Sequence, residues 1–285
     1  MLLGLVSNCW RIQLAEGVPL QALIADADAR GFRAVELRQG SLGEMETGDP
    51  PLPDPQQLTD LPTRFPSVRF NVAVNVPFCD ASLTSADPVF NAGRWTAQAV
   101  AGESPPHLRL VDLTTTDVSP GNIDAVAGCV ADLTRAMAEI DGVLSIENSR
   151  QPWNQIRGVF DAARQHLGSD ADRLRLCFDP CNLLTPDDDV SIPATIAALD
   201  PGELSMVHLK QRRDGPIRPA VCDGDVDWQA ALAALGEIGY SGPFLFEVDS
   251  HPRLWDFLAG SIEYLKRLGL PIEAGRTVGR ISATN

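Results

Sequence analysis

Eight short apolar runs, most of them separated by helix-like segments, constrain the fold of this chain more than any other feature. They cover residues 2–7, 33–38, 68–76, 108–114, 142–148, 173–179, 204–210 and 242–248. Near-continuous apolar runs are typical of strands buried on both faces, and their alternation with helices indicates parallel strands joined by crossover helices. Eight such units in 285 residues predict an α/β fold, a closed (β/α)₈ TIM barrel forming a single domain over residues 1–285. A doubly wound open sheet is the alternative, but no GxGxxG motif follows the first run.

The segments between the runs carry helix signals. Residues 18–31 read as a helix that closes on Gly31, and 122–141 has the apolar spacing of an amphipathic helix. Further helices are expected at 153–168, 192–200, 227–240 and 253–269. The Pro-rich stretch 49–66 is predicted to be a loop.

Composition limits the partners. A net charge of -15 and a pI near 4.6 argue against a surface that neutralises phosphates, so no nucleic-acid partner is expected. No apolar run approaches the length of a membrane span, and the first ten residues read as a strand and not as a signal peptide. Six scattered cysteines without a CxxC pair predict a reduced, cytoplasmic, enzyme-sized protein. Self-association into a homo-oligomer stays open.

Four consecutive apolar runs end on side chains that a core would reject. These are Glu147, Asp179, His208 and Glu247. Because the active site of a barrel lies at the C-terminal ends of its strands, the four side chains are expected to converge. Three carboxylates and an imidazole in a site of low dielectric repel one another unless they are compensated, and a divalent cation satisfies them all. The alternative for each single acid is that it caps the following loop.

The same residues resemble the metal set of the xylose isomerase-like TIM-barrel superfamily of sugar isomerases and epimerases. "VHLKQRRDG" (207–215), "CDGDVDW" (222–228) and "RGFRAVELR" (30–38) resemble its flanking motifs, and the resemblance covers essentially the whole chain. It implies that Glu147, Asp179, His208 and Glu247 bind one divalent metal ion, Mn²⁺, Mg²⁺, Co²⁺ or Zn²⁺. It also implies that Glu147 and Glu247 are the catalytic acid/base pair, which isomerises or epimerises a small carbohydrate-like substrate by proton transfer through a metal-stabilised enediolate.

Two departures from the family pattern leave the reaction open. The sequence "DPCN" places Asn182 where the family commonly has a histidine, and "ENSRQPWNQ" (147–155) lacks the second acid usual in ketose epimerases. A metal-dependent lyase, a dehydratase or a glycoside-cleaving eliminase, is therefore the alternative, as is a member that binds sugar without turnover. Only four histidines are present, too few for the three-zinc site of the related endonuclease-four-type repair enzymes.

Several residues near the strand ends are predicted to contact the substrate. They are Asn182, Arg213, Lys210, Trp10, Trp153 and Glu36. Amide, cationic and aromatic side chains suit hydroxyls, anionic groups and sugar rings respectively. Cys177 and Cys181 are predicted to be bystanders in packing, and His107 to lie at the surface without a partner.

Overall fold

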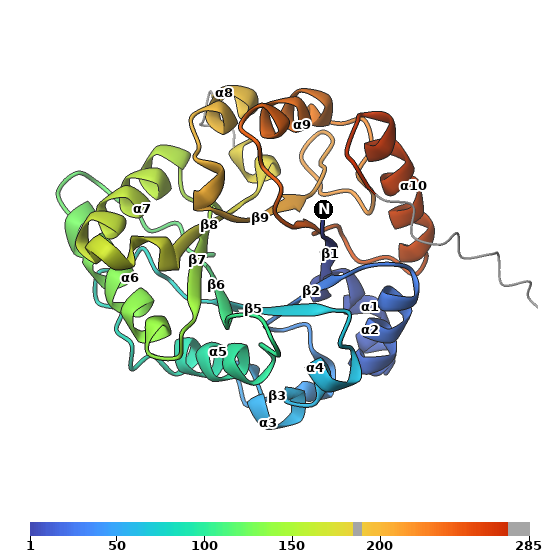
Figure 1. Ribbon diagram of the computed structural model, residues 1–285, viewed down its shortest axis with the longest axis horizontal. Helices are drawn as coiled ribbons and strands as arrows, with labels where there is room; N and C mark the ends of the chain where they lie inside the picture. The colour runs from blue at the N-terminus through green and yellow to red at the C-terminus, as the bar shows by residue number, and fades with distance from the viewer. Residues whose placement is uncertain (185–189, 273–285) are drawn as a thin grey trace, which may run out of the picture.

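The computed structural model describes residues 1–184 and 190–272, and its centre is a closed barrel of eight parallel strands (Figure 1). Around the barrel the order is β1-β10-β9-β8-β7-β6-β5-β2. The strands are β1 (Leu3–Val6), β2 (Ala34–Arg38), β5 (Arg69–Asn75), β6 (His107–Val111), β7 (Val143–Glu147), β8 (Leu174–Phe178), β9 (Leu204–Leu209) and β10 (Phe244–Phe246). All eight predicted runs are strands of the barrel, so the predicted TIM barrel is confirmed. That a single domain spans residues 1–285 stays a prediction.

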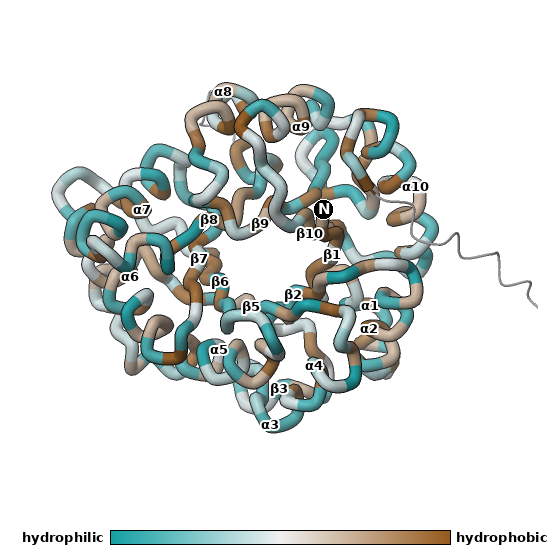
Figure 2. The backbone as a smooth tube through the Cα atoms, viewed as in Figure 1, coloured by the Kyte–Doolittle hydropathy of each residue, from teal (hydrophilic) through white to brown (hydrophobic). Residues whose placement is uncertain are grey.

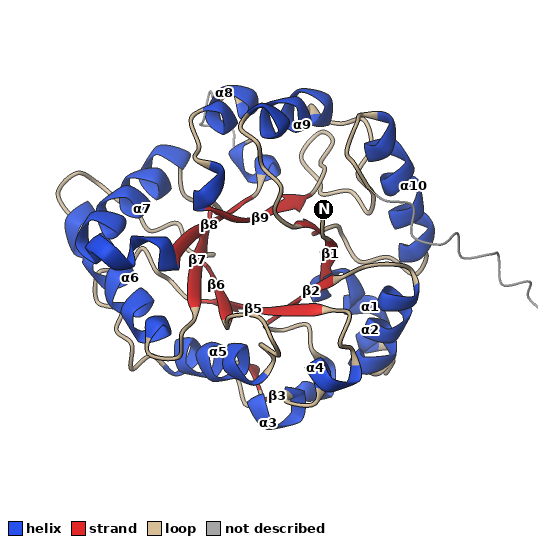
Figure 3. Ribbon diagram, viewed as in Figure 1, coloured by secondary structure: helices blue, strands red, loops and turns tan. Residues whose placement is uncertain are grey.

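Helices form a ring outside the strands, as Figure 3 shows. They are α1 (Arg11–Ala15), α2 (Leu20–Ala29), α3 (Pro55–Leu58), α4 (Leu61–Arg64), α5 (Pro88–Ala99), α6 (Ile123–Ala138), α7 (Trp153–Leu167), α8 (Ile192–Ala197), α9 (Trp228–Glu237) and α10 (Leu254–Arg267). Short 3₁₀ helices add η1 (Ser7–Trp10), η2 (Gly43–Met45), η3 (Gly168–Arg173), η4 (Pro180–Leu183) and η5 (Pro201–Glu203). The helix α2 ends as predicted, since Gly31 follows it at φ +90°. No helix in the described ranges is both long and apolar enough to cross a membrane.

The Pro-rich stretch 49–66 is not a plain loop, which corrects the sequence prediction. It contains β4 (Leu52–Pro53), which pairs with β3 (Glu46–Thr47), and the helices α3 and α4. Proline is tolerated at the first position of a helix, where its missing N–H has no intrahelical partner. Asp54 completes the start of α3 by accepting a hydrogen bond from the backbone N–H of Gln56 at 2.9 Å.

Alternation along the strands separates two environments. Side chains that point outward pack against the helices in the main hydrophobic core, and the barrel strands are mostly apolar in Figure 2. Inside the barrel, a smaller apolar layer contains Val6, Ala34, Cys177, Met206 and Leu245. Buried polar and charged side chains accompany this layer, namely Glu36, Asn71, Arg109, Ser145, Glu147 and His208. Barrel interiors are usually filled by branched apolar residues, so this concentration of charge points to function.

Candidate metal centre

Four side chains at the C-terminal ends of neighbouring strands meet inside the barrel. Glu147 ends β7, Asp179 directly follows β8, His208 lies in β9 and Glu247 directly follows β10. All four are buried, and one ligand atom from each lies within 4.8 Å of the others. The side chains that the sequence predicts to converge are therefore brought together.

The donor atoms of this cluster fit a metal ion. His208 Nδ1 lies 3.4 Å from Glu147 Oε1, 3.4 Å from Glu247 Oε2 and 4.0 Å from Asp179 Oδ2. Within the described residues, His208 Nδ1, Asp179 Oδ2 and Glu247 Oε2 are buried without a hydrogen-bond partner. Lys210 Nζ lies at ion-pair distance from the two carboxylate oxygens, and one divalent cation can satisfy all three atoms, which face one another.

Cys177 lies directly beside His208, which corrects its assignment as a bystander. Its Sγ is 3.4 Å from His208 Nε2, because residue 177 faces the barrel interior like residue 179, two positions further on. Burial raises the pKa of Cys177 to about 11, so the sulfur is a neutral thiol at pH 7. In the tautomer in which Nε2 donates to this sulfur, Nδ1 is left as the atom that can bind a metal.

Arg109 forms the floor beneath the cluster. It donates hydrogen bonds to Glu36 from Nε at 2.8 Å and Nη2 at 2.5 Å, and its Nη1 donates to Glu147 Oε2. Asn71 adds a hydrogen bond to Glu36 at 2.6 Å. Burial raises the pKa of both glutamates, but the charge of Arg109, together with His208 and the hydrogen bonds to each carboxylate, outweighs burial and holds each pKa below its usual value. Both carboxylates are therefore ionised, and Glu36 is a partner of Arg109 below the site, not a group that faces the cavity.

Lys210, the residue directly after β9, extends its side chain to the cluster. Its Nζ lies 2.7 Å from Asp179 Oδ2 and 2.5 Å from Glu247 Oε2, at ion-pair distance but without the angles of a hydrogen bond. Burial raises the pKa of Asp179 by more than Lys210 lowers it. For Glu247 the balance is opposite, and Lys210 with His208 holds its pKa well below the usual range.

Asn182 ties these groups to the wall of the site. Its Nδ2 donates to the backbone oxygen of Asn148 at 2.9 Å and to Glu147 Oε1 at 3.4 Å, and its Oδ1 accepts from Lys210 Nζ at 3.4 Å. The amide of Asn182 donates from nitrogen and accepts at oxygen at the same time. A neutral histidine also has one donor and one acceptor, but its two ring nitrogens place them in a different geometry. The residue that departs from the family pattern thus contacts two members of the charged network.

A cavity of about 390 Å³ opens above the cluster. Its lining includes Arg38, Val111, Leu113, Glu147, Ser149, Arg150, Asn182, Lys210, Arg212, Ile217 and Glu247. Asn182 and Lys210, two of the predicted substrate contacts, line it.

The other predicted contacts lie elsewhere. Arg213 is exposed, and its neighbour Arg212 lines the cavity in its place. Trp10 is fully buried in the main core, and Trp153 packs its half-buried ring edge-to-face against Phe178. Trp10, Trp153 and Arg213 are therefore not included in the candidate site.

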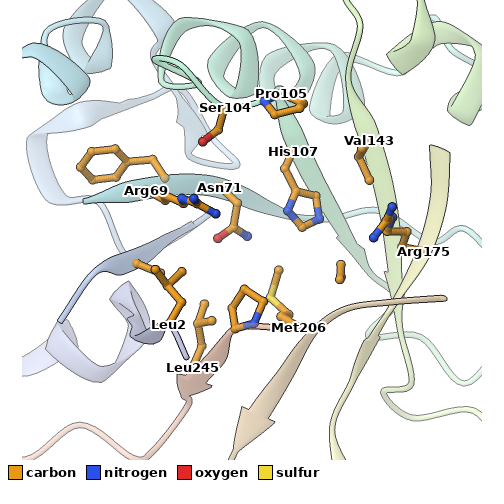
Figure 4. A pocket seen from close by; sticks show the side chains of 14 residues that line it. Leu2, Arg69, Asn71, Ser104, Pro105, His107, Val143, Arg175, Met206 and Leu245 are labelled. Atoms are coloured by element: carbon orange, nitrogen blue, oxygen red, sulfur yellow. The ribbon is translucent and has the colours of Figure 1, made fainter. Parts of the chain in front are cut away.

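A second cavity, of about 330 Å³, lies at the opposite, N-terminal end of the barrel (Figure 4). His107 faces it from the start of β6, with Nε2 2.8 Å from Ser145 Oγ, so this histidine does have a partner. Burial lowers the pKa of His107 to about 4. None of the four clustered residues lines this cavity, and catalytic groups of barrel enzymes lie at the other end.

Three polar residues of the site escaped the sequence reasoning. Arg38 and Arg109 interrupt the apolar runs "VELR" and "LRLV", and this interruption is the signal that could have revealed them. Asn8, in η1, donates from Nδ2 to Glu247 Oε1 at 3.2 Å. Nothing in the sequence around Asn8 distinguishes it from an ordinary loop residue.

Comparison with known proteins agrees with this architecture. Residues 103–268, more than half of the chain, match the family described as "Xylose isomerase-like TIM barrel". No protein among the curated sequences matches.

Solved structures show the same fold over nearly the whole chain. An IolI protein with a bound zinc atom is 16% identical with a TM-score of 0.67, covering 94% of this chain and 96% of its own. D-allulose 3-epimerase from Methylomonas sp., in complex with D-allulose, is 17% identical with a TM-score of 0.67 and the same coverage of both chains. An L-ribulose 3-epimerase is 15% identical with a TM-score of 0.62, covering 96% of this chain and 89% of its own.

Proposed function

Because the chain belongs to the xylose isomerase-like TIM barrel family, we propose that it is a divalent-metal-dependent isomerase or epimerase of a small sugar or sugar-derived keto compound. The observation that carries this proposal is the placement of two glutamates about His208. The carboxylates of Glu147 and Glu247 each have an oxygen 3.4 Å from His208 Nδ1, within one cluster of donor atoms. Zinc in the IolI structure and D-allulose in the epimerase complex support the choice of cofactor and substrate class.

Glu147, Asp179, His208 and Glu247 would hold the metal ion. A divalent cation in this position supplies Lewis acidity, which polarises a carbonyl and stabilises the negative charge that develops on oxygen. Carboxylate-rich donor sets favour the harder ions, and Mn²⁺, Mg²⁺, Co²⁺ and Zn²⁺ all remain compatible with three carboxylates and one imidazole.

Glu147 and Glu247 would move the proton. Arg109 keeps Glu147 ionised, and Lys210 with His208 does the same for Glu247, so both carboxylates are available as bases. One glutamate takes the proton from the carbon next to the carbonyl, and the other returns a proton on the opposite face. A reversible reaction uses each group in turn as base and acid, which suits two similar side chains better than one.

Exchange with solvent deuterium tests this function. Protein loaded with Mn²⁺ is incubated in D₂O with a panel of ketoses, keto acids and their phosphates, and each recovered compound is analysed by mass spectrometry and NMR. We expect deuterium at the carbon beside the carbonyl in an isomeric product. Loss of water or of an aglycone supports the lyase instead, and the absence of both reactions across the panel supports binding without turnover.

Two matched variants control this experiment. Glu147→Gln and Glu247→Gln each remove one carboxylate and are expected to abolish exchange. Glu237→Gln makes the same change at an exposed position of α9, outside the cavity, and is expected to leave exchange unchanged.

A further inference from the structure

Arg38 is a charged side chain of the cavity that pairs with no acid among the residues the structure describes. It is the last residue of β2 and faces the barrel interior two positions after Glu36. Its Nη1 is buried, and within the described residues it has no hydrogen-bond partner. Arg109 and Lys210 differ, since each pairs with two carboxylates. A guanidinium nitrogen that is buried without an acceptor carries a desolvation cost that an anionic ligand can remove.

More cations stand around the mouth of the same cavity. Lys210, Arg150 and Arg212 line it together with Arg38, and the acids that line it are Glu147 and Glu247 of the metal cluster. Arg212 has a buried Nε without a partner in the described part of the chain, while its Nη1 donates to the backbone oxygen of Leu184 at 2.8 Å. Two arginines that line the cavity, Arg38 and Arg212, therefore each keep one buried nitrogen without an acceptor among the described residues.

The site carries a net positive charge once a metal ion is bound. The buried carboxylates Glu36, Glu147, Asp179 and Glu247 carry four negative charges, and the inward-facing cations Arg38, Arg109 and Lys210 carry three positive ones. A divalent cation makes this set net positive, and Arg150 and Arg212 at the mouth add to the excess. A neutral sugar would leave that excess unbalanced in a partly buried cavity, whereas an anionic ligand would match it.

We propose that the substrate of this site carries a carboxylate or phosphate group, which Arg38 binds, with Arg150 and Arg212 holding it at the cavity mouth. This inference rests on the proposed function, and it narrows the substrate from sugars in general to sugar acids or sugar phosphates. The planar fork of a guanidinium group fits both anions through two parallel hydrogen bonds. The reacting carbonyl end would then lie at Glu147 and Glu247, which line the same cavity.

Calorimetric titration of the Mn²⁺-loaded protein with three related probes tests this inference. The probes are D-fructose, which is neutral, D-fructose 6-phosphate and 2-keto-D-gluconate. We expect at least one anionic probe to bind tenfold or more tightly than D-fructose, and the tighter of the two identifies phosphate or carboxylate as the preferred group. Affinity for D-fructose that equals or exceeds that for both anions, or no measurable binding of either anion, overturns the inference.

Variants identify the residue responsible. Arg38→Gln removes one charged hydrogen-bond donor and is expected to weaken binding of the preferred anion by about tenfold to a hundredfold. Binding of D-fructose should change little. Arg213→Gln, an exposed arginine outside the cavity, is the matched control and should keep the anion preference. Mn²⁺ binding by Arg38→Gln shows that its site is folded, and an unchanged preference in that folded variant excludes Arg38 as the anion-binding group.

The titration and the deuterium experiment can fail separately. Selective binding of an anion without deuterium exchange contradicts the proposed reaction and leaves the ligand class standing. Deuterium exchange into neutral ketoses, without preference for an anion, contradicts the ligand class and leaves the reaction standing.

Discussion

Arg109 donates two parallel hydrogen bonds to Glu36 inside the barrel, of 2.8 Å from Nε and 2.5 Å from Nη2, and neither side chain is exposed to solvent. The same guanidinium group holds Glu147 of the metal cluster through Nη1. The floor of the candidate site is thus a charged network that the barrel itself supplies. Such a network specifies the position of Glu147, but it makes the protein dependent on every member being present.

Replacing Arg109 by methionine should destabilise the protein strongly. The substitution leaves two buried carboxylates without their cation, and breaking a buried ion pair from one side costs about 3–5 kcal/mol. Chemical denaturation followed by circular dichroism measures the free energy of unfolding. Adding Glu36→Gln to Arg109→Met removes one of the stranded charges and should recover part of the loss.

Arg173→Met is the control for this prediction. Arg173 pairs with Asp141 at 2.8 Å, but the Asp141 side chain is 86% exposed, and exposed pairs contribute about 0–1 kcal/mol. Equal losses in Arg109→Met and Arg173→Met, or no recovery in the double variant, would show that the buried network does not carry the stability assigned to it.

The fold could be predicted from the sequence because its main signal is local. Strands buried on both faces carry mostly apolar side chains, so the runs at 142–148 and 173–179 are visible without any knowledge of their partners. The stretch 49–66 was predicted less well. Its short strand and helices depend on packing and on Asp54 as a cap, and proline content alone does not distinguish these elements from a loop.

The site could be predicted only where a strand ends. Glu147 and Asp179 stand out because each closes an apolar run, and the C-terminal ends of barrel strands meet at one edge. The contact of Cys177 with His208 could not be predicted from the sequence. It depends on which of the alternating side chains of β8 face the barrel interior, and this depends on the register of the barrel. Residues in loops were the hardest to assign from the sequence, because no strand pattern fixes where their side chains point. The sequence therefore favoured Arg213, whereas the structure places Arg212 in the cavity.

Metal binding should stabilise the folded protein and should require both glutamates. A ligand that binds only the folded state adds about 2.7 kcal/mol at a free concentration of 100 times its Kd. We expect this increase for Mn²⁺ or Zn²⁺ added to protein first treated with a chelator, as measured by thermal and chemical denaturation. In Glu147→Gln/Glu247→Gln the increase should disappear, and in Glu237→Gln it should remain. Full metal occupancy of the double variant in elemental analysis would contradict the assignment of Glu147 and Glu247 as ligands.

Binding of the metal should release a proton at neutral pH. Burial lowers the pKa of His208, but its hydrogen bonds to Cys177 and Glu147 and the negative charge of Glu247 together outweigh burial, so the net pKa lies well above 6.5 and the free site holds an imidazolium. A cation needs Nδ1 without a proton, so metal affinity should rise with pH until that pKa is passed, by about tenfold per pH unit. Titrations in two buffers of different ionisation enthalpy measure the proton directly. Identical heats in both buffers, or a proton release that disappears in His166→Gln, would contradict the role of His208.

His107, which lines the cavity at the N-terminal end of the barrel, should make the free energy of unfolding depend on pH. Burial lowers its pKa in the folded protein to about 4, whereas the unfolded chain titrates near 6.5. Between these values the unfolded state binds more protons, so the stability contribution is complete above pH 6.5 and is lost as the pH falls towards 4. His107→Gln lacks this titration, and the difference in unfolding free energy between wild type and variant should therefore shift by roughly 2–3 kcal/mol in favour of the variant over that window.

His166→Gln, at a histidine on α7 beside the exposed Asp124, is the control and should follow the wild type. A constant difference between wild type and His107→Gln from pH 7 to pH 4 would mean that His107 takes up its proton in the folded protein as readily as in water.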